Sequence, residues 1–297
     1  MPSRNASRFT STAVHGGRVT DGSADVLVNT FRATRLSDPH ACPLVVPAPH
    51  VGGPVLLGQG GALTVLINRK PAIAIYADAH CPPVPAPNPI VTGSSDVFYD
   101  VTDTIAGLRV WQDPDGTIHI GDHMKIPPAR DRVIHANGVA TPIHDGDYGA
   151  HVLGDLAKIG STDVGKRKLQ SLDASGKNVT FVPNGGTEKN AHSAPLDPAA
   201  AKDPSRGSDV NVEYTPEEWP PDPRAETTSS GAEGDVVLLH EMNHAEHQAY
   251  GREADTVRDD SKYGDYHTQE EKNSIEGDEN EYRRARGFPE RHEHTHN

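Results

Sequence analysis

The chain is poor in cysteine and aromatic residues and has no long hydrophobic segment. Its 297 residues include only two cysteines, Cys42 and Cys81, which allow one disulfide at most and exclude a disulfide framework. No run of about 18 apolar residues is present, so we expect no transmembrane helix. The first residues lack an apolar stretch behind their basic side chains. We therefore expect a soluble chain without a general secretory signal.

Positive charge is also scarce. There are 28 basic residues against 42 acidic ones, which gives a formal net charge of -14. Such a field repels phosphate backbones and anionic membranes, which argues against a nucleic-acid partner. Only 34% of the residues are hydrophobic, while 28 glycines and 25 prolines favour short strands and many turns. At about 150 residues per domain, the length indicates two domains.

The first hundred residues contain an internal repeat. Gly22-Ser-Ala-Asp-Val-Leu-Val-Asn29 recurs as Gly61-Ala-Leu-Thr-Val-Leu-Ile-Asn68 and, in shortened form, as Gly93-Ser-Ser-Asp-Val-Phe-Tyr-Asp100. Each copy is typical of a turn followed by a short strand. Three such units can pack around a pseudo-threefold axis, but each is too small to bury a core alone. Another interaction must therefore hold the units together where they converge.

Metal ligation would provide that interaction. Three imidazoles and one thiolate complete a closed, tetrahedral structural zinc site. The candidate ligands at the unit ends are His15, His40, His50 and Cys81. His80 and Cys42 could replace their neighbours.

These residues resemble a PAAR-repeat domain, the conical tip that caps the VgrG spike of type VI secretion systems. The resemblance covers residues 8–100 and includes Pro49-His-Val-Gly-Gly-Pro54 and Thr64-Val-Leu-Ile-Asn-Arg-Lys-Pro-Ala72. It implies an all-β cone over residues 1–102 that docks on a VgrG trimer. It also implies that His15, His40, His50 and Cys81 bind one zinc ion.

Residues 103–297 have the pattern of an α+β module. The sequence predicts a hairpin over 108–120, one or two helices over 147–172 with breaks at Gly160 and Gly165, and strands over 178–182 and 209–214. Two segments rich in Pro, Ser, Ala and charge, 189–206 and 215–233, are predicted to be loops without a core.

His240-Glu-Met-Asn-His244 is the strongest chemical signal in the chain. On a helix, the two histidines lie one turn apart on the same face, so both can bind one zinc ion while Glu241 polarises a water molecule. We expect Asp235 to cap this helix, which would span 236–250, and Gly251 to end it. His292-Glu-His-Thr-His296 matches the same pattern, but it lacks an apolar lead and lies at the chain end. We interpret it as a solvated, weakly metal-binding tail.

An amide-cleaving zinc site needs a third protein ligand. The metzincin motif would require glycine at 247 and histidine at 250, where this chain has His247 and Tyr250. That class is therefore excluded, and a carboxylate from a predicted helix over 269–286 is expected instead. Helical spacing places Glu271 and Glu279 on one face, and Glu271 is the first choice. The alternatives are Glu270, Glu276 and Glu279.

The same segments resemble the NleD-like effector metallopeptidases over residues 140–291. The resemblance lies in Leu238-Leu-His-Glu-Met-Asn-His-Ala245, Glu279-Asn-Glu-Tyr-Arg-Arg284 and Gly287-Phe-Pro-Glu-Arg291. It implies a secreted bacterial endopeptidase that cleaves proteins of a target cell. A tyrosine could donate a hydrogen bond to the oxyanion. The candidates are Tyr263, Tyr266 and Tyr282.

The two halves together predict a type VI effector that carries one structural and one catalytic zinc ion. It would pass from the bacterial cytoplasm into a target cell. Its expected partners are the VgrG spike, a protein substrate and an immunity protein in the producing cell. Two other functions remain open: a non-catalytic tip protein with an adaptor-binding C-terminal module, and a zinc hydrolase of another polymer such as peptidoglycan.

Overall fold

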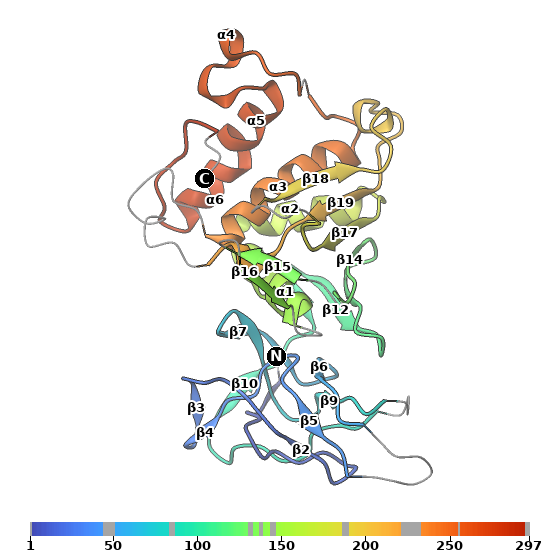
Figure 1. Cartoon of the computed structure of the whole chain (residues 1–297), viewed down its shortest axis with the longest axis vertical. Helices are drawn as coiled ribbons and strands as arrows, with labels where there is room; N and C mark the ends of the chain where they lie inside the picture. The colour runs from blue at the N-terminus through green and yellow to red at the C-terminus, as the bar shows by residue number, and fades with distance from the viewer. Residues whose placement is uncertain are drawn as a thin grey trace.

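The computed structural model divides into a β-rich N-terminal part and an α+β C-terminal part, which lie one against the other (Figure 1). This agrees with the β-rich first part and the α+β second part predicted from the sequence. Among the helices that the structure describes, none is long and apolar enough to cross a membrane. The described residues are 2–43, 51–82, 87–129, 133–136, 139–142, 147–185, 190–220, 233–254 and 256–294, with the backbone alone for 133–136 and 139–142.

The N-terminal part consists of short antiparallel strand pairs rather than one continuous sheet. This follows from the many turns between its short apolar segments. The pairs are β1 (Ser3–Asn5) with β10 (Phe98–Asp100), β2 (Arg18–Val19) with β5 (His40–Ala41), β3 (Leu27–Val28) with β4 (Phe31–Arg32), β6 (Val55–Leu56) with β9 (Asp78–Ala79), and β7 (Gly61–Ile67) with β8 (Lys70–Ile73).

Two copies of the repeat form the same turn. Asn29 and Thr30 have φ values of 50° and 70°, and Asn68 and Arg69 have φ values of 50° and 68°. Consecutive positive φ angles are those of a type I′ hairpin turn, which asparagine tolerates better than most residues. The side chain of each asparagine then bonds to another copy, Asn29 to Asp96 and Asn68 to Asp25. The turns of the repeat therefore hold its copies together.

A closed ring of backbone hydrogen bonds joins three segments of this part. The Ser7 N–H donates to the Ile73 carbonyl at 2.9 Å, and the Ile73 N–H donates to the Thr34 carbonyl at 3.0 Å. The Thr34 N–H closes the ring by donating to the Ser7 carbonyl at 3.2 Å. Such a head-to-tail ring is the arrangement that three similar units around a common axis would make.

The C-terminal part is built on a seven-stranded mixed sheet in the order β11-β12-β13-β14-β17-β19-β18. β14, β17 and β19 run parallel, while β18 lies antiparallel to β19 at the edge. A separate hairpin precedes the helices. The bounds are β11 (Thr104–Ile105), β12 (Leu108–Gln112), β13 (Ile118–Ile120), β14 (Met124–Ile126), β15 (Val133–Ala136), β16 (Val139–Pro142), β17 (Val179–Val182), β18 (His192–Pro195) and β19 (Val210–Glu213).

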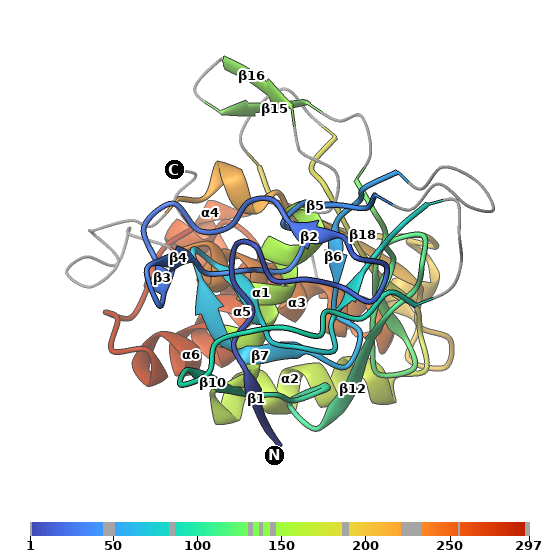
Figure 2. The ribbon, with the colours of Figure 1, turned by 90° about the horizontal axis from the view of Figure 1, so that it is seen from below.

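Helices α1, α2 and α3 pack against one another, and α3 also packs against β18 and β19. Viewed from below, the N-terminal loops lie in front of these helices (Figure 2), and β7 and β8 contact α1. The helices are α1 (Asp147–Gly160), α2 (Asp163–Ala174), α3 (Gly234–Ala249), α4 (Asp260–Tyr263), α5 (Gln269–Ser274) and α6 (Asn280–Ala285). Short 3₁₀ turns span Ala200–Lys202, Pro216–Glu218 and Gly264–Tyr266.

Most elements predicted for this half are confirmed: the hairpin β12–β13, the helices α1 and α2 separated after Gly160, and the strands β17 and β19. The break predicted at Gly165 is wrong, because α2 runs through this glycine, where a side chain would collide with the Ile159 carbonyl of α1. The loop predicted over 189–206 is wrong. This segment forms β18, and Ala200 and Ala201 are buried. Its strand sequence, His-Ser-Ala-Pro, has no β-branched residue, so only the long-range pairing with β19 makes it a strand.

The two parts are joined by buried ion pairs rather than by a linker alone. Arg69, in the β7–β8 turn, places Nη2 2.6 Å from Oδ2 of Asp155, which is fully buried in α1. The Tyr214 hydroxyl donates to the same carboxylate oxygen at 2.8 Å. Lys70 pairs with Asp147 at the start of α1. One hydrophobic cluster includes residues of both parts, so they share a core.

Candidate active site

Helix α3 carries both histidines of the predicted motif on a deeply buried element. Val236, Leu239 and Met242 are almost completely inaccessible to solvent, so the helix is anchored on several faces. The helix ends at Ala249, and Gly251 follows with φ +65°, as predicted. The histidines are therefore presented from a rigid support.

Asp235 is not the helix cap that the sequence predicts. Helix α3 begins at Gly234, so Asp235 lies in its first turn and is fully buried. Its carboxylate accepts a hydrogen bond from the Tyr282 hydroxyl at 2.6 Å and pairs with Arg286. A capping side chain bonds to the first turn of its own helix, whereas this carboxylate joins α3 to α6. Such a contact between distant segments cannot be predicted from sequence spacing.

The two imidazoles converge on a common point. His240 Nε2 and His244 Nε2 lie 3.0 Å apart, with their rings at an interplanar angle of 85°. Glu271 completes the group: its Oε2 is 3.2 Å from His240 Nε2, and its Oε1 is 3.5 Å from His244 Nε2. Zinc ligands at 2.0–2.1 Å in a tetrahedron would be separated by about 3.3 Å, so these distances fit that ion.

The opposite nitrogens of both rings are held by carboxylates. His240 Nδ1 lies 2.8 Å from Glu279 Oε2, and His244 Nδ1 lies 3.0 Å from Glu270 Oε1. Glu279 is fully buried and accepts a hydrogen bond from Arg283 Nε at 3.0 Å. Carboxylates in this position fix the ring orientation so that Nε2 faces a metal. The arrangement therefore provides oriented ligands as well as the right ligand types.

Electrostatics around the rings favours positive charge. Burial lowers the pKa of the His240 imidazole, but its hydrogen bonds to the Glu271 and Glu279 carboxylates outweigh that effect and raise the pKa to about 9. The Oε2 atom of Glu271 is buried, and His240 Nε2 lies 3.2 Å from it. A buried carboxylate oxygen of this kind is costly unless a cation satisfies it. The residues present therefore fit a zinc ion.

The segment that supplies the carboxylates is not the continuous helix predicted over 269–286. Thr268 caps α5 by accepting a hydrogen bond from the Glu271 N–H at 3.0 Å. A kinked segment, Ile275–Glu279, then separates α5 from α6, and Gly277 in it has non-helical angles of φ -82° and ψ -118°. In a straight helix, Glu271 and Glu279 would be separated by about 12 Å along the axis. The irregular segment brings both carboxylates to one imidazole ring.

Glu241 lies beside the histidines on α3 and is only 7% exposed. Burial raises the pKa of its carboxyl group, while the charges of His240 and His244 oppose that effect. The charge of His192, on β18, also lowers the pKa of the Glu241 carboxyl group. Because β18 packs on α3, the edge strand of the described sheet runs alongside this glutamate.

The other sequence candidates have different positions. Glu270 contacts His247 Nδ1 at 2.6 Å as well as His244, so it lies on the far side of the ring from Glu271. Glu276 is exposed. Tyr282 is held by Asp235 beneath the start of α3, and Tyr263 is buried beside Lys262. Tyr266 lies near Lys272.

Comparison with known proteins identifies the C-terminal part. Residues 136–297 match the model of the peptidase M91 family, described as effector protein. The chain belongs to this family. The match covers all the described helices and the site above, and it supports the NleD-like effector peptidase domain predicted from sequence. No curated protein matches the chain.

One further residue lies at the site of the M91 domain, in the tail that the sequence predicts to be solvated and weakly metal-binding. The tail is not solvated at His294, because His294 Nε2 lies 3.3 Å from Glu271 Oε2 and the side chain is only 16% exposed. The second His-Glu-x-x-His pattern drew attention to this tail. No apolar segment precedes this pattern, so the local sequence does not indicate the tertiary contacts that bring the tail to the site.

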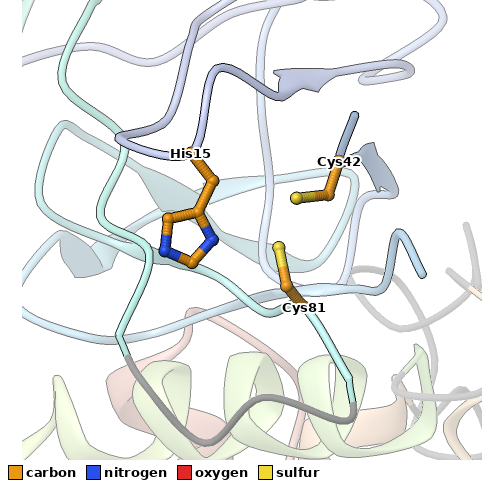
Figure 3. Close-up of side chains that lie close together, drawn as sticks. All are labelled: His15, Cys42 and Cys81. Atoms are coloured by element: carbon orange, nitrogen blue, oxygen red, sulfur yellow. The ribbon is translucent and has the colours of Figure 1, made fainter. Parts of the chain in front are cut away.

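A second group of histidine and cysteine side chains lies in the N-terminal part. His15, Cys42 and Cys81 point toward one another from separate loops, and one ligand atom from each lies within 4.8 Å of the others (Figure 3). His40 Nε2 is 3.3 Å from Cys81 Sγ. The structure thus places Cys42, a sequence alternative, in the group. The predicted ligand His50 lies outside the described residues.

Proposed function

We propose that the M91 domain is a zinc-dependent endopeptidase in which His240, His244 and Glu271 hold the metal. The convergence of the two Nε2 atoms with the Glu271 carboxylate carries this proposal. A zinc ion there would act as a Lewis acid on a peptide carbonyl and lower the pKa of a water molecule. Glu279 and Glu270 keep both imidazoles in the tautomer that leaves Nε2 available.

Glu241 is the proposed general base. Its position on α3, one residue from the first ligand, allows it to accept a proton from the attacking water and deliver it to the leaving amine. Among the described strands, β18 is at the edge of the sheet, and it packs on this helix. An extended peptide could add to that edge as another strand, which would align its backbone past Glu241. This mode of binding favours a protein substrate.

The N-terminal part of the chain supports a role in delivering the M91 domain into a target cell. We propose that residues 1–102 form a PAAR-like tip that docks on a VgrG trimer of a type VI secretion system, with an immunity protein protecting the producing cell. The ring of hydrogen bonds through Ser7, Thr34 and Ile73 supports three units around an axis. The group His15, Cys42 and Cys81 supports a structural zinc ion.

A comparison of protein termini tests the enzymatic proposal. The zinc-loaded full chain is incubated with lysates of candidate target cells, and new N-termini are identified by mass spectrometry. We expect new termini within defined proteins, all of which disappear after chelation and return when zinc is restored. A zinc-loaded chain that releases peptidoglycan fragments instead, or that yields no new termini in any lysate, would contradict the endopeptidase assignment.

Metal analysis tests the structural site. We expect about two zinc ions per full-length chain. Cys42→Ser should lower the content to about one, and His240→Ala should remove the other, because each change deletes a ligand of a different site. Co-purification with a VgrG trimer should weaken in Cys42→Ser but not in His240→Ala. Unchanged zinc content in Cys42→Ser would exclude this cysteine as a ligand.

A further inference from the structure

The last described residues place an additional imidazole against the proposed catalytic metal site. His294 Nε2 lies 3.3 Å from Glu271 Oε2, and the His294 and His240 ring centroids are 6.1 Å apart at an interplanar angle of 27°. One ligand atom from each of His240, Glu271 and His294 lies within 4.8 Å of the other two. The His294–Glu271 separation is again close to the roughly 3.3 Å between ligands of a tetrahedral zinc ion.

The tail is held in this position by specific contacts. The Asn280 side chain makes two hydrogen bonds with the backbone of Arg291, donating to its carbonyl at 2.8 Å and accepting from its N–H at 2.7 Å. Asn280 is only 3% exposed, and Phe288 is buried against the main core. The His294 N–H donates to the Asp265 carbonyl at 2.8 Å. The position of the ring therefore follows from the fold of the chain that precedes it.

We infer that His294 is a fourth protein ligand of the catalytic zinc and closes the site in the resting enzyme. This inference rests on the proposed peptidase function. A hydrolytic zinc site has three protein ligands and an open position for water, whereas four protein ligands make a closed site. In this proposal the His294 ring, which lies beside His240 and Glu271, takes the open position, so it must leave before a water molecule and a peptide can enter. One neutral imidazole is exchanged for one neutral water, and no other reactant is needed.

Two variants in the same tail distinguish zinc ligation by His294 from any effect that a change elsewhere in the tail would have. His294→Ala removes the proposed ligand, and His292→Ala removes an exposed histidine two residues away. Cobalt replaces zinc in the full chain, and its visible absorption reports the ligands around the ion. Competition with a chromophoric chelator measures zinc affinity. The N-terminal site contributes equally to all these measurements and cancels in the differences between variants.

We expect His294→Ala to change the visible cobalt spectrum and to lower zinc affinity at one of the two sites about 10- to 100-fold, the range seen even for residues that only support a ligand. The kcat/KM of zinc-saturated His294→Ala should exceed that of the wild type, because no side chain then has to leave the fourth position before water and substrate bind. His292→Ala should match the wild type in all three measurements.

Identical cobalt spectra and zinc affinities in both variants would overturn the inference. A loss of kcat/KM in His294→Ala with an unchanged cobalt spectrum would also overturn it, because the His294 ring would then stabilise the transition state and not bind the metal. His240→Ala distinguishes failure of the underlying function: if that variant retains both zinc ions, the catalytic site itself is wrong, whatever His294 does.

Discussion

Glu241→Gln should lower kcat/KM for a cleaved protein by about 10²- to 10⁴-fold while leaving zinc bound, because the amide keeps the shape of the side chain but cannot accept the proton. Glu241 is buried beside the ligands and is not itself placed to hold the metal. Initial rates on a substrate found by terminus analysis, together with zinc content, measure both effects.

The matched control is Glu276→Gln, an exposed carboxylate on the segment that carries Glu271. It should retain full activity and full zinc content. If Glu241→Gln keeps its activity within tenfold of the wild type, Glu241 is not the general base. If it loses zinc as well as activity, the residue supports the metal rather than the proton transfer.

The second large effect concerns stability. Asp155→Ala should lower the free energy of unfolding of the full chain by about 3 kcal/mol, because it leaves the Arg69 guanidinium and the Tyr214 hydroxyl without their buried acceptor. Asp155 is fully buried, while the Arg69 side chain is 20% exposed, so we expect the lower end of the range for broken buried pairs. Denaturant unfolding followed by circular dichroism gives this value.

Glu281→Ala serves as the control for that experiment. Glu281 pairs with Arg167 at 2.6 Å, but the two side chains are 43% and 58% exposed, so the loss of this pair should leave stability close to that of the wild type. An Asp155→Ala variant that unfolds at the same denaturant concentration as Glu281→Ala would show that the contact between the two parts contributes little. A large loss would show that the first part and the M91 domain stabilise each other.

Local sequence patterns predicted the site-bearing helix well. The spacing of His240 and His244 places both imidazoles on one face of any helix, and the apolar run before them requires that helix to be buried. The strands β17 and β19 and the helices α1 and α2 likewise follow from periodicity and from the break after Gly160. These features depend on residues close together in the chain, so the sequence carries them directly.

Contacts between distant segments could not be predicted from local periodicity and spacing. Periodicity placed Glu271 and Glu279 on one face of one helix, whereas the irregular segment at Gly277 puts them against opposite nitrogens of the His240 ring. β18 lacks strand-forming residues and is defined by its pairing with β19. Asp235 was assigned to a local cap, although its partners lie about fifty residues further along the chain.

What the sequence determined by itself is the chemistry available: two histidines and a glutamate on one helix, carboxylates in a later segment, and thiols and imidazoles in an unusually turn-rich first part. Only the tertiary structure decided which of these atoms meet. It selected Glu271 to face both Nε2 atoms, brought Cys42 beside His15 and Cys81, and returned His294 to the site. The physical reason is that residue type and spacing set local geometry, whereas the convergence of ligands depends on long-range packing.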